Sequence, residues 1–340
     1  MFFRKTKASQ TVSPLQKVFV ELAPFRVEPQ FVGRVWGWND LHPWYDRVAD
    51  AEPIGEVWLT GDDCLIGTGP HAGKSLREIF LEVPEVLLGE DSPSTDSPIL
   101  IKVIFAREKL SVQVHPDDAL ARKYGQPRGK TECWYALSAE PGAKVAAGLR
   151  PGVTMNQVKA GIEDGKLEQS LNLIPLNAGD MVFVDAGTVH AIWPGSVLLE
   201  TQQNSDLTYR MFDYGRGREL HIEKSLEATR LQTQAGKVSP TVMGDRTILV
   251  KADYFCVERI PIDVSRPSTS LAGEGELTPG LSYLFAASGA GRLSSPSFQP
   301  IDLPERGIVA VPASSPVFAV QDVGGLDLIR ISPRWPERAG

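Results

Sequence analysis

The sequence of 340 residues predicts a mainly β fold with helical inserts. Glycine and proline are abundant, at 31 and 26 residues, and few segments have the apolar spacing of a long amphipathic helix. In the last hundred residues, β-rich runs such as LSYLFAA (281–287) and GIVAVPA (307–313) follow one another at the intervals typical of a sandwich or barrel. A chain of this length can bury one large hydrophobic core or two ordinary ones.

The composition indicates which kinds of binding partner and which cellular compartment to expect. A net charge of −7 disfavours general binding to nucleic acid or to a membrane surface, because both attract a basic face. Cys64, Cys133 and Cys256 are odd in number and widely spaced, which indicates free thiols in a reducing compartment. The basic start lacks the apolar region of a secretory signal, and no apolar run is long enough to span a membrane. We therefore expect a cytoplasmic protein without nucleic-acid or membrane partners.

Local patterns predict the individual elements in chain order. β-forming runs predict strands within residues 17–37, 55–59, 99–105, 110–115, 130–134, 181–184 and 197–201. Helical spacing predicts helices over residues 74–90, 117–124, 154–171 and 220–231. Pro84 is expected to bend the first helix, and Thr154 is the expected N-cap of the third. A tight turn is expected between strands 181–184 and 197–201.

Two segments share a rhythm of glycine, β run and small-residue turn, namely GDMVFVDAGTVH (179–190) and RGIVAVPASSP (306–316). This rhythm indicates two related β units, of which the second has lost its polar ligands. All five histidines lie at or before His221, so the last third of the chain holds no histidine-bearing metal site. Such a site is therefore expected in the first unit.

Two alternating runs gather the polar residues that could do chemistry. Side chains at positions i and i+2 of a strand share one face. The shared faces carry Ser111, Gln113 and His115 in the first run, and Lys130, Glu132 and Trp134 in the second. We expect the two runs to be neighbouring strands that offer an amide, an imidazole, a carboxylate and an ammonium group to one place. This combination suits a metal ion with a charged substrate beside it.

The segment from Gly179 to His190 resembles the second motif of the cupin barrels, with Asp185 where that motif usually has proline. Such a turn presents its histidine at the start of a strand, pointing into the barrel. The alternative is a histidine that caps a hairpin, just as Gln113 could be an interior hydrogen-bonding residue. Together with the two runs, the motif gives a candidate metal set of Gln113, His115, Glu132 and His190. Two neutral imidazoles and a carboxylate suit zinc, and Mn²⁺, Fe²⁺ or Co²⁺ would also fit.

Other charged residues allow two interpretations each. Asp206 and Arg210 lie four apart in a polar segment and share a side, which alone indicates a surface ion pair. Lys102 lies inside the apolar run ILIKVIF and needs a partner, either a phosphate or a carboxylate. Lys130 could equally be a solvated lysine at a strand end. RGRELHIEK (216–224) reads as a solvated helix start that carries a surface histidine.

Four motifs, in the same order, resemble those of the type I phosphomannose isomerase family, zinc-dependent enzymes of the cupin superfamily, in its shorter bacterial form. They are LSVQVHPDD (110–118), GKTECWY (129–135), AGTVHAI (186–192) and ETQQNSDLTYRMFDYGR (200–216). With Val35-Trp36-Gly37, residues 55–58 and Lys102, the similarity runs from about residue 20 to residue 230. Residues 60–98 and the C-terminal unit carry fewer landmarks of the family. The resemblance therefore defines the metal site better than it defines the substrate preference.

The resemblance implies a cupin-type double β-barrel, jelly-roll-like, with a helical insertion. Its parts are an N-terminal catalytic barrel with the metal site at 17–60 and 99–240, a partly helical insertion at 61–98, and a metal-free cupin-like barrel at 241–335. A monomer or a weak homodimer is expected.

The resemblance also implies roles for individual residues. One Zn²⁺ per chain is expected on Gln113, His115, Glu132 and His190. Arg210 matches the catalytic arginine of the family, and Lys130 and Asp206 match groups for binding or proton transfer. Ser111 and Lys102 match positions associated with the phosphate of the substrate.

The implied reaction is the interconversion of mannose 6-phosphate and fructose 6-phosphate through an enediol-type intermediate. It requires a base at the carbon and stabilisation of a developing oxyanion. The base could be a metal-linked water, Asp206 or Lys130. An isomerase or epimerase of another phosphosugar, or a non-catalytic sugar-binding cupin, are the alternative functions.

Overall fold

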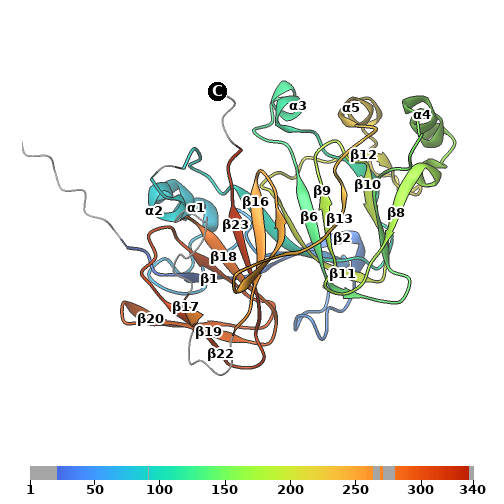
Figure 1. The fold of residues 1–340 in the computed structure, drawn as a ribbon. Coiled ribbons are helices and arrows are strands. Elements are labelled where there is room, and N and C mark those ends of the chain that lie inside the picture. Colours follow the sequence, from blue (N-terminus) through green and yellow to red (C-terminus); the bar gives the residue numbers. More distant parts are fainter. Residues whose placement is uncertain (1–20, 91, 263–268, 271–279, 337–340) are drawn as a thin grey trace, which may run out of the picture.

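A computed structural model describes residues 21–90, 92–262, 269–270 and 280–336, so residues 17–20 of the first predicted segment lie outside the described residues. Antiparallel strands dominate, which confirms the predicted mainly β class. They form four sheets, numbered I to IV below. In Figure 1 the strands from the two halves of the chain stand side by side.

Sheets I and II enclose the first hydrophobic interior. Sheet I consists, in spatial order, of β13 (Gly236–Val238), β9 (Met181–Val184), β6 (Glu132–Ala139), β11 (Ser196–Gln203), β4 (Ile99–Phe105), β3 (Ile54–Trp58) and β2 (Gln30–Trp38). Sheet II consists of β12 (Tyr209–Phe212), β5 (Val112–Val114), β10 (His190–Ile192), β7 (Lys144–Leu149) and β8 (Leu171–Pro175). Leu198 of sheet I packs in one cluster with Val145 and Ile192 of sheet II.

Sheets III and IV enclose a second interior. Sheet III consists of β1 (Phe25–Val27), β21 (Ile308–Val311), β18 (Ser282–Ser288), β23 (Asp327–Pro333), β16 (Phe255–Ile260), β15 (Arg246–Lys251) and β14 (Thr241–Met243). Sheet IV consists of β17 (Thr269–Ser270), β22 (Ala319–Asp322), β19 (Gly291–Ser295) and β20 (Phe298–Leu303). Leu284 and Leu328 of sheet III pack with Val320 of sheet IV. Because β1 pairs with β21, this strand belongs to sheet III, although it lies within residues 17–60, which were predicted to be part of the N-terminal barrel.

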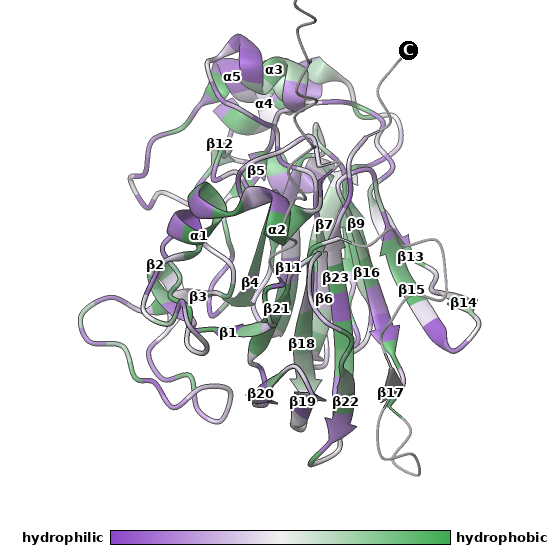
Figure 2. Ribbon diagram, turned by 90° about the vertical axis from the view of Figure 1, so that its left-hand side faces the viewer, coloured by the Kyte–Doolittle hydropathy of each residue, from purple (hydrophilic) through white to green (hydrophobic). Residues whose placement is uncertain are grey.

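The largest cluster lies where sheets I and III pack back to back. It joins Val103 of sheet I to Val257 and Ile329 of sheet III. The helix α1 (Leu76–Glu82) adds Ile79 and Phe80 to it, and the helix α2 (Pro84–Leu88) adds Leu87. Sheet I is thus covered on both faces, and every residue of β4 is buried, as its continuous apolar run predicts. The strands of both sheets carry green, apolar segments in Figure 2.

Helices cover the outer face of sheet II. They are α3 (Asp118–Lys123), α4 (Met155–Glu163), the short 3₁₀ helix η1 (Leu167–Ser170) and α5 (Ile222–Ala228). Val158 and Ala228 from these helices pack against Val112 and Val114 of β5. Figure 1 shows α3, α5 and α4 along one edge of the molecule. The opposite face of β5 is therefore free to face sheet I.

Two local predictions differ from the structure, and one is confirmed. Pro84 divides the first predicted helix into α1 and α2, as expected. The helix predicted to reach residue 171 ends at Glu163, because Gly165 takes a φ of +68° that favours glycine and stops a right-handed helix. The tight turn predicted between β9 and β11 is wrong, because β10 lies between them and crosses to sheet II.

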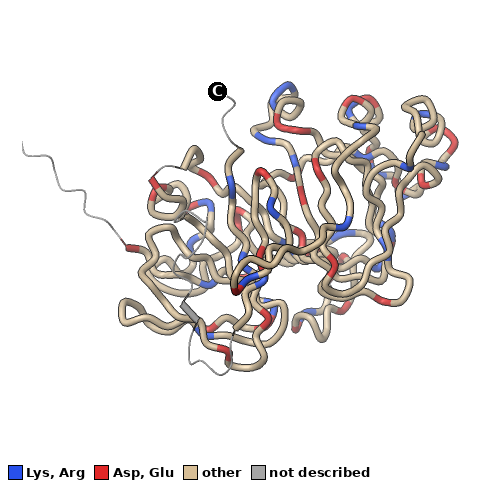
Figure 3. Tube along the Cα trace, in the orientation of Figure 1, with Lys and Arg blue, Asp and Glu red and all other residues tan. Residues whose placement is uncertain are grey.

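Charged residues of both signs are mixed through the two halves of the chain (Figure 3). Many pair with each other, as Arg128 does with Asp96 and Arg259 with Asp327. Such exposed pairs add little to stability. None of the helices in the described part of the chain has the length and apolar character needed to cross a lipid bilayer.

Replacing Thr154 with alanine is expected to lower the free energy of unfolding by about 1 kcal/mol. Thr154 is the N-cap of α4: its hydroxyl accepts from the backbone N–H of Gln157 at 3.3 Å, and the Gln157 side chain accepts from the N–H of Thr154 at 2.8 Å. Chemical denaturation measures the change. Asn156→Ala, on the same exposed helix, is the control and is expected to change stability by less than about 0.5 kcal/mol. Equal stability of the two variants would contradict the capping role.

Candidate active site

A polar pocket of about 480 Å³ lies between the facing sides of sheets I and II. This volume is typical of a small-molecule site. Three neighbouring strands of sheet II place Arg210, Gln113 and His190 in one row, because Gln113 pairs with Arg210 on β12 and with His190 on β10. Val112 and Val114 point to the opposite face, so the alternation predicted for β5 is confirmed.

Sheet I supplies the carboxylate and the ammonium group. Glu132 is the first residue of β6, and Lys130 precedes it by two positions. Since β5 and β6 belong to different sheets, the prediction that the two runs are neighbouring strands is wrong. The runs meet across the interior, where Glu132 still reaches His115.

His115, Glu132 and His190 form a buried cluster whose ligand atoms all lie within 4.8 Å of one another. Nε2 of His115 lies 3.4 Å from Oε2 of Glu132, and Nε2 of His190 lies 3.3 Å from Oε1. Each Nδ1 faces a backbone carbonyl, that of Leu207 at 2.8 Å for His115 and that of Thr188 at 2.9 Å for His190. A carbonyl can only accept, so each Nδ1 carries the proton and each Nε2 keeps its lone pair toward Glu132.

A tight turn before β10 holds the two histidines together. The hydroxyl of Thr188 donates to Oδ1 of Asp185 at 2.8 Å. Gly187 takes a φ of +90°, which favours glycine, and its N–H donates to the carbonyl of His115 at 2.8 Å. The turn that resembles a cupin motif therefore connects the start of β10 directly to the end of β5.

Burial sets the protonation states of the cluster. It lowers the pKa of His115 to about 3, with a further contribution from Lys130, and it also lowers the pKa of His190. Burial alone would raise the pKa of Glu132, but the ammonium group of Lys130 holds that pKa well below its usual range. Neutral imidazoles beside an ionised carboxylate are the states that metal binding requires. Among the described residues, Nε2 of His115 has no hydrogen-bond partner and faces Oε2 of Glu132 at 3.4 Å, so this cluster could hold a divalent cation.

The amide of Gln113 completes the cluster. Its Nε2 lies 3.2 Å from Nε2 of His190, and its Oε1 accepts from the hydroxyl of Ser111 at 3.1 Å. In this orientation the amide donates to the lone pair of His190. A half-turn of the amide would present the oxygen to the cluster, which is the orientation that a metal ligand needs.

The two lysines of the pocket are both buried and paired. Nζ of Lys130 lies 3.1 Å from Oε2 of Glu132 and 3.9 Å from Oε1 of Glu200, so Lys130 is not a solvated lysine at a strand end. Nζ of Lys102 lies 3.0 Å from Glu200 and 3.3 Å from Glu56. Of the two partners that the sequence allowed for Lys102, the structure provides the carboxylate.

The remaining predicted residues lie on the same pocket. Arg210 donates to the backbone carbonyl of Glu219 at 2.9 Å, while its buried Nε has no hydrogen-bond partner among the described residues. Burial, with Arg218 nearby, lowers the pKa of Arg210. Asp206 is exposed and lines the pocket, and Ser111 is buried beside Gln113. Seven of the nine residues predicted from the sequence thus line one pocket, and His115 and His190 adjoin it through Glu132, although the roles of all nine stay predictions.

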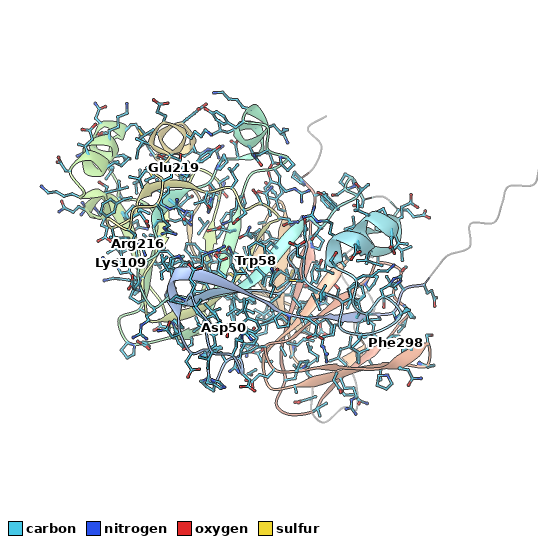
Figure 4. All side chains as sticks on the ribbon, turned by 180° about the vertical axis from the view of Figure 1, so that it is seen from behind. Asp50, Trp58, Lys109, Arg216, Glu219 and Phe298 are labelled. Carbon is cyan, nitrogen blue, oxygen red and sulfur yellow. The ribbon has the colours of Figure 1, made fainter. Side chains whose placement is uncertain are left out.

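Arg218 was missed as a pocket residue. It lines the pocket and donates through Nε to Asp213 at 2.8 Å, so it is not part of a solvated helix start. His221 is only partly exposed and accepts the backbone N–H of Arg210 through Nδ1 at 3.2 Å. In Figure 4, Lys109 and Arg216 lie next to each other on this side of the molecule. No local pattern separates Arg218 from the arginines around it, so only the folded chain identifies it.

Glu56 and Glu200 were also missed, and here a signal was available. Each carboxylate lies in a strand whose other residues are largely buried, β3 for Glu56 and β11 for Glu200. A charged residue in such a strand needs a partner. Both carboxylates meet this condition, as Lys102 does.

Comparisons with known proteins agree with this site. The family described as phosphomannose isomerase type I, catalytic domain, matches residues 25–146. A mannose-6-phosphate isomerase of Streptococcus mutans is 35% identical over 280 residues, which cover 76% of this chain and 88% of the relative. A mannose-6-phosphate isomerase of Bacillus subtilis is 33% identical over 249 residues, covering 69% of this chain and 78% of the relative.

A solved structure extends the similarity to the whole fold. The crystal structure of a mannose 6-phosphate isomerase from Bacillus subtilis superimposes with a TM-score of 0.80 at 28% sequence identity, covering 91% of this chain and 99% of the other. The agreement therefore includes sheets III and IV, where the sequence carries few landmarks. From its sequence similarity over most of its length, the family match over residues 25–146 and its fold, the chain belongs to the type I phosphomannose isomerase family.

Proposed function

We propose that this chain is an enzyme that interconverts mannose 6-phosphate and fructose 6-phosphate through an enediol-type intermediate. The observation that carries the proposal is the buried cluster of His115, Glu132 and His190 beside Lys130, in a pocket of about 480 Å³. Membership of the family and the names of its relatives support the same reaction.

We propose that Gln113, His115, Glu132 and His190 hold one Zn²⁺ ion per chain. The donor set fits, because two Nε2 lone pairs and an ionised carboxylate converge, and Nε2 of His115 has no hydrogen-bond partner among the described residues. Mn²⁺, Fe²⁺ or Co²⁺ would fit the same donors. When bound, the cation supplies Lewis acidity toward the oxygens of the sugar.

The residues of the pocket divide the remaining chemistry. Isomerisation moves a proton between C1 and C2 of the sugar while negative charge develops on oxygen. Arg210 keeps its charge at any physiological pH and stabilises that negative charge. Lys130 orients the sugar oxygens, and on this chain the groups able to carry the proton are Lys130 and Asp206.

The phosphate of the substrate requires cationic side chains that can leave their present partners and bind it. Lys102, held between two carboxylates, is buried, and so is Ser111. We therefore assign the phosphate to the mouth of the pocket, where the side chains of Arg34 and Arg218 are 28% and 27% exposed. In this assignment Ser111 orients Gln113, and Lys102 orients Glu200.

Turnover of a panel of hexose and pentose phosphates tests the proposal. We expect the ratio kcat/KM for mannose 6-phosphate to exceed that for the other sugars by at least about tenfold. A higher ratio for another phosphosugar would favour an isomerase or epimerase of different specificity. Binding of the sugars without any turnover would identify a sugar-binding cupin and contradict the proposed enzyme.

A further inference from the structure

We propose that Glu56, Lys102 and Glu200 are positioning residues that hold the ammonium group of Lys130 in place through a buried row of alternating charges. This inference rests on the proposed function, because these three residues would affect the proposed reaction only through the position of Lys130. The row begins at Arg34 near the mouth of the pocket.

The row follows the order of the strands in sheet I. β2, β3, β4, β11 and β6 are consecutive neighbours, and Lys102 is the register partner of Glu200. Arg34 lies 2.8 Å from Glu56, Glu56 lies 3.3 Å from Lys102, and Lys102 lies 3.0 Å from Glu200. Beyond Glu200, the distances to Lys130 and on to Glu132 are 3.9 Å and 3.1 Å. Positive and negative groups alternate along the whole row.

Two tryptophans fix the carboxylates from the side. Nε1 of Trp58 donates to Oε2 of Glu56 at 2.8 Å, and Nε1 of Trp134 donates to Oε2 of Glu200 at 3.0 Å. Oε1 of Glu200 is left between two ammonium groups, that of Lys102 and that of Lys130. The position of Glu200 therefore depends on Lys102, and the position of Lys130 depends on Glu200.

Burial makes the row sensitive to a single change. Burial alone would raise the pKa of Glu56, but Lys102 and Arg34 lower it to about 2. Removing one member of a buried ion pair leaves the other charge uncompensated, so its neighbours move toward new partners. A shift of this kind next to Glu132 displaces Lys130 from the substrate and lowers turnover.

Glu56→Gln and Trp58→Phe test the inference in the full-length, metal-loaded protein. We expect Glu56→Gln to lower kcat by about 10- to 100-fold, with KM changed by less than about threefold and the metal content per chain unchanged. Trp58 does not line the pocket and lies near the middle of the molecule in Figure 4, so Trp58→Phe removes the hydrogen bond that fixes Glu56 and leaves the lining of the pocket unchanged. It is expected to lower kcat in the same direction by a smaller factor.

Glu258→Gln and Trp38→Phe are the matched controls. Glu258 is as buried as the members of the row and is paired with Arg330 at 2.7 Å, but it lies on sheet III. Trp38 packs against the same cluster as Trp58. Both controls are expected to lower the Tm while kcat stays at the wild-type value.

A double variant separates positioning from folding. Glu56→Gln with Lys102→Met removes one negative and one positive charge, so we expect the Tm to recover toward wild type while kcat stays low. Recovery of kcat together with the Tm would overturn the inference, as would wild-type kcat in both Glu56→Gln and Trp58→Phe. A wild-type protein without activity on any phosphosugar would overturn the proposed function as well, which distinguishes the two failures.

Discussion

Removal of the bound metal with a chelator is expected to lower isomerase activity by about three orders of magnitude, and addition of Zn²⁺ is expected to restore it. The expected loss corresponds to the several kcal/mol that a Lewis acid supplies to a transition state with developing negative charge. In this chain, the lone pairs of His115 and His190 converge on Glu132, and that of His115 has no hydrogen-bond partner among the described residues. Activity and metal content are measured on the same sample.

A variant shows whether the effect belongs to this cluster. His190→Ala removes one of the two converging nitrogens and is expected to reduce metal content and activity together. His42→Asn is the control, because His42 is exposed and pairs with Asp40 and Asp46 away from the pocket. Full activity after chelation, or His190→Ala protein that turns over substrate at the wild-type rate, would contradict the proposed metal site.

Replacement of Arg210 with glutamine is expected to lower kcat by about 10²- to 10³-fold while metal content is unchanged. Arg210 on β12 is the register partner of Gln113 on β5 in sheet II. Its buried Nε has no hydrogen-bond partner among the described residues. A guanidinium in this place can stabilise the negative charge of the intermediate, and glutamine cannot. The loss is expected in kcat more than in KM, because the interaction strengthens only as the charge develops.

Arg216→Gln is the matched control for Arg210. Arg216 is on the same segment and pairs with Asp213 at 2.8 Å, but it does not line the pocket. We expect a change in kcat of less than about threefold, since Arg216 does not line the pocket and Asp213 keeps Arg218 as a partner in the variant. Turnover at the wild-type rate by Arg210→Gln protein with full metal content would remove Arg210 from the mechanism.

Local sequence patterns were sufficient for strands such as β4, β5 and β9 and for the faces of the site, but not for β7, β8 and β12. The alternation in β5 separates Gln113 from Val112 and Val114, and that separation depends only on strand geometry. The same alternation does not say which strands pair, so the second run was assigned to a neighbouring strand although it lies in the opposite sheet. Pairing depends on long-range packing, which a local period does not contain.

The sequence predicts that a buried charged residue needs a partner, but it does not predict which residue that partner is. Lys102 requires a partner because an apolar strand surrounds it, and this requirement is visible in the sequence. That the partners are Glu56 and Glu200 follows from the order of β3, β4 and β11 in sheet I. Arg218 lacks even such a signal, because a charged residue in a loop needs no partner.

The back-to-back packing of sheets I and III has a consequence for the catalytic half. The strand that carries Glu200 turns Leu199 toward sheet III, and the strand that carries Lys102 does the same with Val103. β1, which precedes all of these strands in the chain, pairs with β21 and is part of sheet III. Sheet III therefore supports the strands that carry Lys102 and Glu200, and removal of either half of the chain would expose the apolar back of sheet I to water.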